Sequence, residues 1–455
     1  MARLFGTDGV RGKAGEFPLD VPTVRRLGGA LVRALRHDDE PSAPHPQGIK
    51  FLSGRDTRES GSWIERELAF GVRSQGGVLT SAGIVPTPAI AYLTPRMGYT
   101  AGVVISASHN PFEDNGIKVF SGAGEKFTET LEQHVESIME DRAWSVPAGD
   151  APAVEQIDYR AEYIGHLEDI LPADARTKGM RIAVDCANGA TTTVAPRLFA
   201  ELGFEARCIG CEPDGRNINL RCGSTAPDAL AGVVIEDGYA LGIAYDGDGD
   251  RAIFVDAAGR IVDGDAVMLL CARQMQREGR LRGNAVVATV MSNIGLELAL
   301  RDAGIDIVRC PVGDKYVMEE MLKRGIALGG EQSGHVIFSD YLFTGDGLAT
   351  SLNVLRTMAA TGRSLADLAS EMTAFPQVLL NLRVQQKIDL KTIPEVAAVI
   401  TSVESRLAGH GRLLVRYSGT EPLLRVMLEG RDEHEIRAWG QEIIDAVKAS
   451  IGAAV

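Results

Sequence analysis

The chain has 455 residues, of which 45% are hydrophobic and 24% charged, and its formal net charge is -14. This composition is typical of soluble globular proteins, and the length predicts roughly three or four domains. The negative charge argues against nucleic acid as the main partner, because a phosphate backbone requires a basic face. An anionic small substrate is still allowed, because clustered arginines form local positive pockets inside acidic proteins.

The sequence also argues against a membrane or secreted protein. No apolar run approaches the roughly 20 residues that span a bilayer, and Met1 to Gly6 lacks the apolar core of a signal peptide. The six cysteines are scattered, which predicts reduced thiols and a cytoplasmic location. Cys208 and Cys211 have the spacing of a redox or zinc pair, but no second pair or nearby histidine completes a site. We therefore interpret them as structural or incidental.

The first part of the chain offers arginines on short polar segments. Arg11 lies in the glycine-rich segment Gly6 to Gly12, and Arg55 lies in a similar polar segment. Either could approach a phosphate, although arginines next to aspartates are usually structural. Between them, apolar residues at helical spacing from Val24 to Leu35 predict a helix. The stretch His37 to Gln47 has three prolines and three acidic residues, which predicts a solvated loop and a local insertion.

A serine on a sharp turn follows the next buried strand. The strand is predicted over Gly102 to Ile105, and Ser108 precedes the turn signal Asn110-Pro111. Ser108 is a candidate nucleophile, or a turn serine that hydrogen-bonds its own backbone. Lys118 could supply a donor or an acid/base group, although an isolated lysine is more often on the surface.

An aspartate ladder, Asp246-Gly247-Asp248-Gly249-Asp250-Arg251, is the most informative segment. A buried strand predicted over Leu241 to Tyr245 leads into it, so the carboxylates lie at the end of a strand, where α/β proteins bind ligands. Three carboxylates at this spacing suit Mg²⁺. The alternative is an acidic turn that solvates itself. With Ser108, the ladder indicates a metal beside a phosphate-carrying serine, that is, a phosphoryl-transfer site.

Two later segments also carry polar groups suited to a phosphosugar. Gly330 to His335 combines a carboxylate, an amide, a hydroxyl and an imidazole, although His335 could be an ordinary loop histidine. Ser418-Gly419-Thr420 lies between Arg416 and Arg425, which predicts a phosphate-binding turn or a plain hairpin with surface arginines.

Alternation of strands and helices predicts α/β layers with mostly parallel sheets. Composition shifts near Pro147 to Pro152, Ala257 to Gly259 and Phe375-Pro376 predict four domains, with boundaries at 1–155, 156–258, 259–374 and 375–455. The last domain is expected to be a smaller α+β unit, in which a hairpin precedes a closing helix.

The segments together resemble the α-D-phosphohexomutase superfamily. Four of them match in order across nearly the whole chain: Ser106 to Pro111, Asp246 to Arg251, Gly330 to His335 and Arg416 to Pro422. The resemblance implies three similar α/β mixed-sheet domains and a smaller C-terminal α+β domain around a central cleft, with the last domain as a lid. Gln332 and the segment Phe5 to Gly12 are most similar to the branch that acts on glucosamine phosphates.

The resemblance also implies roles for individual residues. Ser108 would be a phosphoserine, and its phosphate with Asp246, Asp248 and Asp250 would hold one Mg²⁺ per chain. Catalytic acid/base or charge-stabilising roles would fall to Lys118, Arg11 and His335. Substrate-binding roles would fall to Arg251, Lys315, Glu331, Ser333, Arg416, Ser418, Gly419, Thr420 and Arg425.

The implied reaction interconverts glucosamine 6-phosphate and glucosamine 1-phosphate through a 1,6-bisphosphate, for amino-sugar nucleotide and cell-wall precursor synthesis. The alternatives are a phosphomannomutase or phosphoglucomutase, and a metal-dependent sugar phosphatase that transfers the phosphate to water. The expected partner is a small phosphosugar, and a homodimer is left open.

Overall fold

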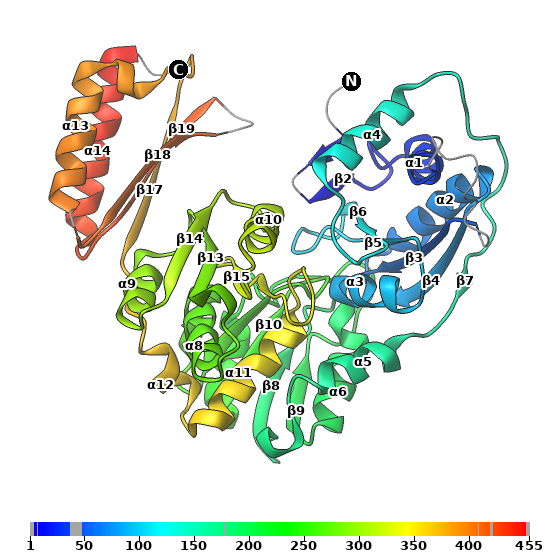
Figure 1. The fold of residues 1–455 in the computed structure, drawn as a ribbon, viewed down its shortest axis with the longest axis horizontal. Helices are drawn as coiled ribbons and strands as arrows, with labels where there is room; N and C mark the ends of the chain where they lie inside the picture. Colours follow the sequence, from blue (N-terminus) through cyan, green and yellow to red (C-terminus); the bar gives the residue numbers. More distant parts are fainter. Residues whose placement is uncertain are drawn as a thin grey trace. The chain divides into compact units, whose positions relative to one another are not determined.

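The computed structural model describes residues 4–6, 8–36, 48–176, 179–407, 409–418 and 422–451. The predicted insertion His37 to Gln47 lies outside these residues. The described strands form four sheets, and the chain divides into two compact units. Unit 1 contains residues 1–291 and 305–370, and unit 2 contains residues 292–304 and 371–455. Figure 1 shows the elements in sequence colours.

The first sheet has seven strands in the order β1-β2-β6-β5-β3-β4-β7. Its strands are β1 Phe5–Gly6, β2 Gly9–Lys13, β3 Lys50–Arg55, β4 Val78–Ile84, β5 Ala101–Ile105, β6 Asp114–Ser121 and β7 Glu155–Gln156. Its helices are α1 Val21–Ala34, α2 Gly61–Ser74, α3 Thr87–Arg96 and α4 Glu129–Glu140. The predicted helical positions Val24, Leu27 and Leu31 are all buried, so the apolar face of α1 lies in the core.

The second sheet has five strands in the order β12-β11-β10-β8-β9. Its strands are β8 Arg181–Asp185, β9 Glu205–Ile209, β10 Leu241–Tyr245, β11 Ala252–Asp256 and β12 Ile261–Val262. The helices of this region are α5 Arg160–Glu168, α6 Ala195–Glu201 and α7 Asp228–Asp237, with short 3₁₀ turns at Ala173–Ala175 and Ala190–Thr193. Because β12 pairs with β11, the sheet continues past the boundary predicted at residue 258.

The third sheet has four strands in the order β14-β13-β15-β16. Its strands are β13 Ala285–Thr289, β14 Asp306–Cys310, β15 Leu328–Gly330 and β16 Val336–Phe338. Its helices are α8 Gly264–Arg277, α10 Asp314–Arg324, α11 Gly347–Thr361 and α12 Leu365–Ala369, with a 3₁₀ turn at Arg282–Asn284.

Each of these three sheets joins parallel strands to an antiparallel edge. The pairs β5–β6, β10–β11 and β15–β16 are antiparallel, whereas β3–β5, β10–β8 and β13–β15 are parallel. The expectation of mostly parallel sheets is therefore wrong for the first two sheets. Short connections produce this result, since a parallel crossover needs a dozen or more residues. The prediction of mixed α/β sheets is confirmed.

Unit 2 holds the smaller C-terminal α+β fold. Its antiparallel sheet, in the order β17-β19-β18, contains β17 Gln377–Arg383, β18 Arg412–Tyr417 and β19 Leu423–Glu429. Its helices are α9 Ile294–Asp302, α13 Pro394–Leu407 and α14 Glu433–Ile451, with a 3₁₀ turn at Leu390–Thr392. In Figure 1 α13 (orange) and α14 (red) lie side by side on one face of this sheet. The predicted hairpin and closing helix are confirmed.

Unit 2 includes α9, although this helix falls inside the domain predicted over residues 259–374. The buried Glu429 accepts a hydrogen bond from the backbone N–H of Ile294 at 3.1 Å, and Arg412 donates to the carbonyl oxygen of Ser292 at 2.9 Å. These contacts hold α9 to the C-terminal sheet. None of the helices within the described residues has the length and apolar content that a bilayer crossing requires.

Close contact between α1 and α2 depends on glycine. A Cβ atom on Gly71 would lie 1.9 Å from the carbonyl oxygen of Arg25, and one on Gly28 would lie 2.3 Å from that of Leu68. No side chain fits at these separations, so the two helices can pack at this distance only with glycine at both positions.

We predict that Gly71→Ala lowers the free energy of unfolding by about 1–3 kcal/mol, because the added methyl group forces the helices apart. The matched control is Gly232→Ala in α7, where an added Cβ meets nothing within 4 Å. This control should be neutral or stabilising by up to about 1 kcal/mol, since alanine is the better helix former. Urea unfolding midpoints check both variants, and equal midpoints would contradict the packing argument.

Candidate active site

The Ser108 loop is the connection between the antiparallel strands β5 and β6. Ser108 has a φ of 53°, in the left-handed region that non-glycine residues rarely occupy. Its backbone N–H donates to the hydroxyl of Ser106 at 2.9 Å, and that hydroxyl donates to Asp56 at 2.6 Å. Such strained conformations persist where the surroundings over-determine them, often at functional sites.

Arg58 is the residue that holds this loop in place. Its side chain is fully buried and forms a salt bridge with Asp56 at 2.8 Å. The guanidinium also donates to four backbone carbonyl oxygens, those of Ser108, Asn110, Pro111 and Asp114. A planar fork with five donors suits this task, and a lysine cannot replace it. Arg58 therefore fixes the backbone that presents Ser108.

The aspartate ladder connects the antiparallel strands β10 and β11. Asp246, Asp248 and Asp250 are all buried, and each offers a carboxylate oxygen within 4.8 Å of the others. The Ser108 hydroxyl donates to Asp246 Oδ2 at 2.5 Å. Glycine is required between the aspartates, because a Cβ on Gly247 would lie 2.5 Å from the carbonyl oxygen of Ser108. The structure thus brings together two loops 138 residues apart in the chain.

Three carboxylates buried this close together repel one another strongly when they are ionised. Burial, together with the charges of Asp250 and Asp248, raises the pKa of the Asp246 carboxyl well above its usual value. Within the described residues, Asp248 Oδ1 and Asp250 Oδ1 are buried and accept no hydrogen bond. Buried carboxylate oxygens without donors are costly unless a cation meets them, and this donor set suits Mg²⁺.

Lys118, on β6, partly balances this charge. Its ammonium group lies 2.9 Å from Asp248, 3.2 Å from Asp250 and 3.0 Å from Asp8. Burial favours the neutral amine, but the three carboxylates more than offset this effect and raise the pKa of Lys118 well above its usual value. Lys118 is therefore a buried cation, which differs from the surface position expected of an isolated lysine.

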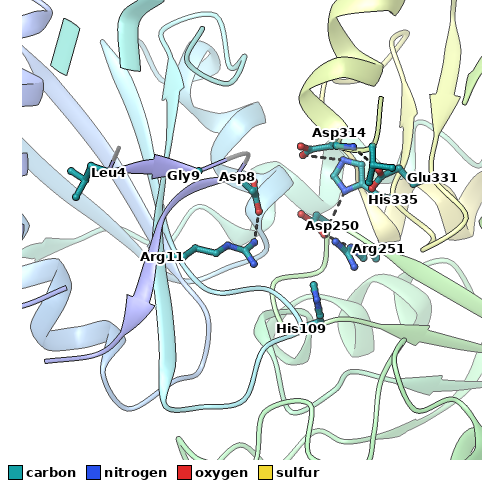
Figure 2. Close-up of a pocket in the computed structure, with 13 residues that line it drawn as sticks. Leu4, Asp8, Gly9, Arg11, His109, Asp250, Arg251, Asp314, Glu331 and His335 are labelled. Carbon is teal, nitrogen blue, oxygen red and sulfur yellow. Dashed lines mark hydrogen bonds and ion pairs between the residues drawn. The ribbon is translucent and has the colours of Figure 1, made fainter. Parts of the chain in front are cut away.

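A cavity of about 430 Å³ opens in front of the aspartate ladder. Figure 2 shows Arg11 and Asp8 on one side of the close-up and His335, Asp314 and Glu331 on the other. The cavity is lined by Leu4, Gly6, Asp8, Gly9, Arg11, His109, Asp250, Arg251, Val312, Gly313, Asp314, Glu331 and His335. Both signs of charge line it, which suits a substrate with an anionic group and several hydroxyls.

His335 lies between two carboxylates on the far side of this cavity (Figure 2). Its ring nitrogens are 3.6 Å from Asp250 and 3.5 Å from Asp314, and Nε2 accepts a hydrogen bond from the N–H of Gly345 at 3.0 Å. Burial favours the neutral ring, but Asp250 and then Asp314 offset this effect and raise the pKa of His335. The imidazole is thus positioned to hold a proton at the cavity wall.

The remaining predicted residues of unit 1 occupy varied positions. Glu331 lines the cavity and accepts from the N–H of Gly313 at 3.1 Å, whereas Ser333 is exposed on the same loop. Lys315 forms a salt bridge with Glu132 at 2.9 Å and does not line the cavity in front of the aspartate ladder. Arg55 pairs with Glu65 at 3.4 Å, so its side chain has a structural partner.

The predicted phosphate-binding turn lies in unit 2. Arg416 on β18 and Arg425 on β19 are directly opposite in the antiparallel pair, so their side chains lie on the same face. Ser418 is buried, and its carbonyl oxygen accepts from Lys387 at 2.6 Å. Gly419 and Thr420 lie outside the described residues.

Sequence reasoning missed several residues that build the site. Thr87 donates to Asp248 at 2.6 Å, Asn219 donates to the carbonyl oxygen of Ser108 at 2.9 Å, and Lys126 bridges Asp8 and Asp314. No local pattern marks them, because each meets its partner across a large sequence separation. Asp8 lies in the segment Gly6 to Gly12, which was selected for Arg11. Its negative charge within that segment was the one local feature that could have indicated a role for Asp8.

We predict that Arg58→Lys lowers the free energy of unfolding by about 2–4 kcal/mol, because several buried acceptors lose their donors. The control is Arg66→Lys on the exposed side of α2, which should change stability by less than about 0.5 kcal/mol. Denaturant unfolding measures both variants. Equal stability of the two would show that Arg58 does not hold the loop.

We predict that Asp248→Asn weakens Mg²⁺ binding by about tenfold or more, since one anionic ligand is lost. Isothermal titration calorimetry with MgCl₂ checks this value, with the exposed Asp237→Asn as the matched control. Unaltered affinity in Asp248→Asn would exclude the ladder as the cation site.

Comparison with known proteins gives a consistent result over the whole chain. Models of the phosphoglucomutase/phosphomannomutase family match in four parts: α/β/α domain I over residues 2–145, domain II over 161–259, domain III over 263–375 and the C-terminal domain over 379–446. The boundaries of the four predicted domains remain predictions.

Two similar curated proteins carry the same name. The chain is 47% identical to the phosphoglucosamine mutase of Syntrophotalea carbinolica, with 99% of this chain and 98% of the relative covered. It is 46% identical to that of Solibacter usitatus, with 99% of both covered.

Solved structures share the fold. A phosphoglucomutase/phosphomannomutase family protein from Burkholderia thailandensis has a TM-score of 0.81 at 24% identity, covering 99% of this chain and 98% of that one. Aspergillus fumigatus N-acetylphosphoglucosamine mutase, solved with GlcNAc-6P and magnesium, has a TM-score of 0.67 at 18% identity, covering 98% and 95%. From the domain models and the curated relatives, the chain belongs to the phosphoglucomutase/phosphomannomutase family and, within it, to the phosphoglucosamine mutases.

Proposed function

We propose that this protein interconverts glucosamine 6-phosphate and glucosamine 1-phosphate by passing a phosphoryl group through Ser108. Family membership supports the reaction class, and the curated relatives are named for this activity. The observation that carries the proposal is the hydrogen bond from the Ser108 hydroxyl to Asp246, inside a cluster of three buried carboxylates. A serine hydroxyl at this position could carry and accept a phosphoryl group, because a cation held by the carboxylates would neutralise the charge that develops during transfer.

Asp246, Asp248 and Asp250 would hold one Mg²⁺, with an oxygen of the Ser108 phosphate as a further ligand. The two carboxylate oxygens without hydrogen-bond donors fit this assignment. Bound there, the cation would neutralise the charge that spreads over the transferring phosphoryl group.

The reaction begins with the phosphorylated form of Ser108. The sugar's C1 hydroxyl attacks the phosphoserine phosphorus, the bond from phosphorus to Oγ breaks, and glucosamine 1,6-bisphosphate forms. The bisphosphate then reorients in the site, so that its 6-phosphate faces Ser108. Ser108 Oγ attacks the 6-phosphate, and glucosamine 1-phosphate is released. Three groups would move protons or stabilise charge. Arg11 and His335 line the cavity, and Lys118 contacts Asp8, which lines it as well.

Arg251 is the last residue of the ladder, and its backbone N–H donates to Asp246 at 3.2 Å. We assign Arg251, Glu331, Ser333 and Lys315 to the sugar and its nearer phosphate. We assign Arg416, Ser418, Gly419, Thr420 and Arg425 to the phosphate that is not being transferred. The opposed arginines of β18 and β19 support this second group, because arginine forks match phosphate oxygens.

We predict that the protein purified from its host carries one phosphoryl group, on Ser108, and that Ser108→Ala lowers mutase turnover on the order of a thousandfold or more. The variant loses the phosphate acceptor, while its unfolding midpoint should stay close to that of the parent protein. Intact mass spectrometry with peptide mapping and a coupled glucosamine 1-phosphate assay check the two statements. The matched control is Ser137→Ala on the exposed face of α4, which should leave turnover unchanged.

Near-normal turnover in Ser108→Ala would contradict the assignment. Free phosphate released faster than glucosamine 1-phosphate would support the phosphatase alternative instead. Higher turnover with mannose or glucose phosphates than with glucosamine 6-phosphate would favour a phosphomannomutase or phosphoglucomutase.

A further inference from the structure

The two carboxylate oxygens of Asp248 have different surroundings. Oδ2 accepts a hydrogen bond from the Thr87 hydroxyl at 2.6 Å and another from the Lys118 ammonium group at 2.9 Å. Oδ1 is buried and accepts no hydrogen bond from the described residues. Because two donors anchor one oxygen, the direction of the other oxygen is fixed. Oδ1 is therefore the oxygen of Asp248 that is left to meet a cation.

Thr87 is suited to this anchoring by its place in the fold. It is the first residue of α3, and it is completely buried. Besides the side-chain contact, its backbone N–H donates to the carbonyl oxygen of Asp248 at 2.8 Å. The next residue of the ladder packs closely here as well, since a Cβ on Gly249 would lie 3.2 Å from Cβ of Pro86. The start of α3 thus holds both the backbone and the side chain of Asp248.

The same helix connects the aspartate ladder to the Ser108 loop. α3 packs against β3 and β5 of the first sheet, and β5 leads into the loop that carries Ser108. Asp248 lies between β10 and β11 of the second sheet. Thr87 therefore links the position of a carboxylate from one sheet to an element that packs beside the strand that presents Ser108.

Of the two donors to Oδ2, Thr87 allows the cleaner substitution. Lys118 also contacts Asp8 and Asp250, so its replacement removes a positive charge from the whole cluster. Thr87 is neutral. Its replacement by valine exchanges a hydroxyl for a methyl group, so the charge of the cluster is unchanged and the anchor of Asp248 is lost.

We propose that Thr87 is a positioning residue for the cation site, whose hydroxyl holds Oδ2 of Asp248 so that Oδ1 faces the divalent cation. Hydrogen bonds to a carboxylate ligand orient it, and their loss typically weakens metal binding by about 10–100-fold. The inference rests on the proposed function, because the cation is the Mg²⁺ assigned there to the three aspartates.

Isothermal titration calorimetry of the full-length protein with MgCl₂ tests the role of Thr87, with all samples in the same phosphorylation state. Thr87→Val should weaken Mg²⁺ binding by about tenfold, whereas Thr87→Ser, which keeps the hydroxyl, should stay within about twofold of the parent protein. The matched control is Thr94→Val, which should leave the affinity unchanged. Thr94 is the other fully buried threonine of α3, and it donates to the carbonyl oxygen of Ile90 at 2.7 Å. Equal affinity of the parent protein and Thr87→Val, or equal weakening in Thr94→Val, would overturn the proposal.

A double variant shows whether Thr87 acts through Asp248. In an Asp248→Ala background the anchored oxygen is absent, so the addition of Thr87→Val should change the Mg²⁺ affinity by less than about twofold. A further loss as large as that in the parent background would mean that Thr87 acts independently of Asp248, and it would overturn the proposal.

The parent protein alone provides a second test, which does not depend on the folding of any variant. In a crystal structure grown with MnCl₂, the manganese ion should contact the Asp248 oxygen that faces away from Thr87. The other oxygen should keep its hydrogen bond from the Thr87 hydroxyl. An ion bound by the oxygen that accepts from Thr87 would overturn the proposal.

Turnover separates this inference from the proposed function. In Thr87→Val the Mg²⁺ concentration at half-maximal mutase turnover should rise by the same factor as the Kd for Mg²⁺, while the KM for glucosamine 6-phosphate at saturating Mg²⁺ stays unchanged. A changed KM with an unchanged Mg²⁺ requirement would overturn the positioning role. If the parent protein has no mutase activity, the proposed function fails, while calorimetry still decides whether Thr87 positions Asp248. Mg²⁺ binding that Asp248→Ala leaves intact would overturn both.

Discussion

The confinement of three buried carboxylates at one point is the constraint on which the rest of the site depends. Asp246, Asp248 and Asp250 follow directly from a buried strand, so the fold places their charges where water cannot screen them. Part of this charge is balanced by Lys118, whose ammonium contacts two of the three. The balance is incomplete, because two carboxylate oxygens accept no hydrogen bond from the described residues. The residual negative charge favours a bound cation, and the cation in turn favours a bound phosphate.

The architecture places three functional loops in equivalent positions. The Ser108 loop, the aspartate ladder and the Glu331–His335 loop each connect an antiparallel pair whose first strand also pairs in parallel within a mixed sheet. Such connections are short, so their residues stay close to the strand ends that hold them. This explains how three separate sheets supply a nucleophile, a cation site and a cavity wall within one compact unit. Arg58 adds the rigidity that the strained backbone at Ser108 requires.

Sequence analysis predicted those parts of the site that follow from local pattern. The ladder and Ser108 were found because buried strands lead into them, and the C-terminal hairpin was found from its alternating residues and turn. Arg58 and Lys126 were missed because their partners are distant in the chain, such as Asp314, which is 188 residues from Lys126. The same cause applies to Lys118, whose role was implied by the resemblance and not by its local sequence, because the carboxylates that surround it are 130 and 132 residues away. The apolar runs alone predicted mostly parallel sheets, because buried parallel and antiparallel strands have similar apolar runs; the mixed sheets were predicted from the resemblance.

The central claim is that a phosphate on Ser108 and a divalent cation share one site with the aspartate ladder. A crystal structure of the phosphorylated protein grown with MnCl₂ tests it most directly, because anomalous scattering locates the manganese ion. The account predicts an ion bound by oxygens of Asp246, Asp248, Asp250 and the Ser108 phosphate. An ion bound elsewhere, or an ion in the ladder without contact to a phosphate on Ser108, would contradict it.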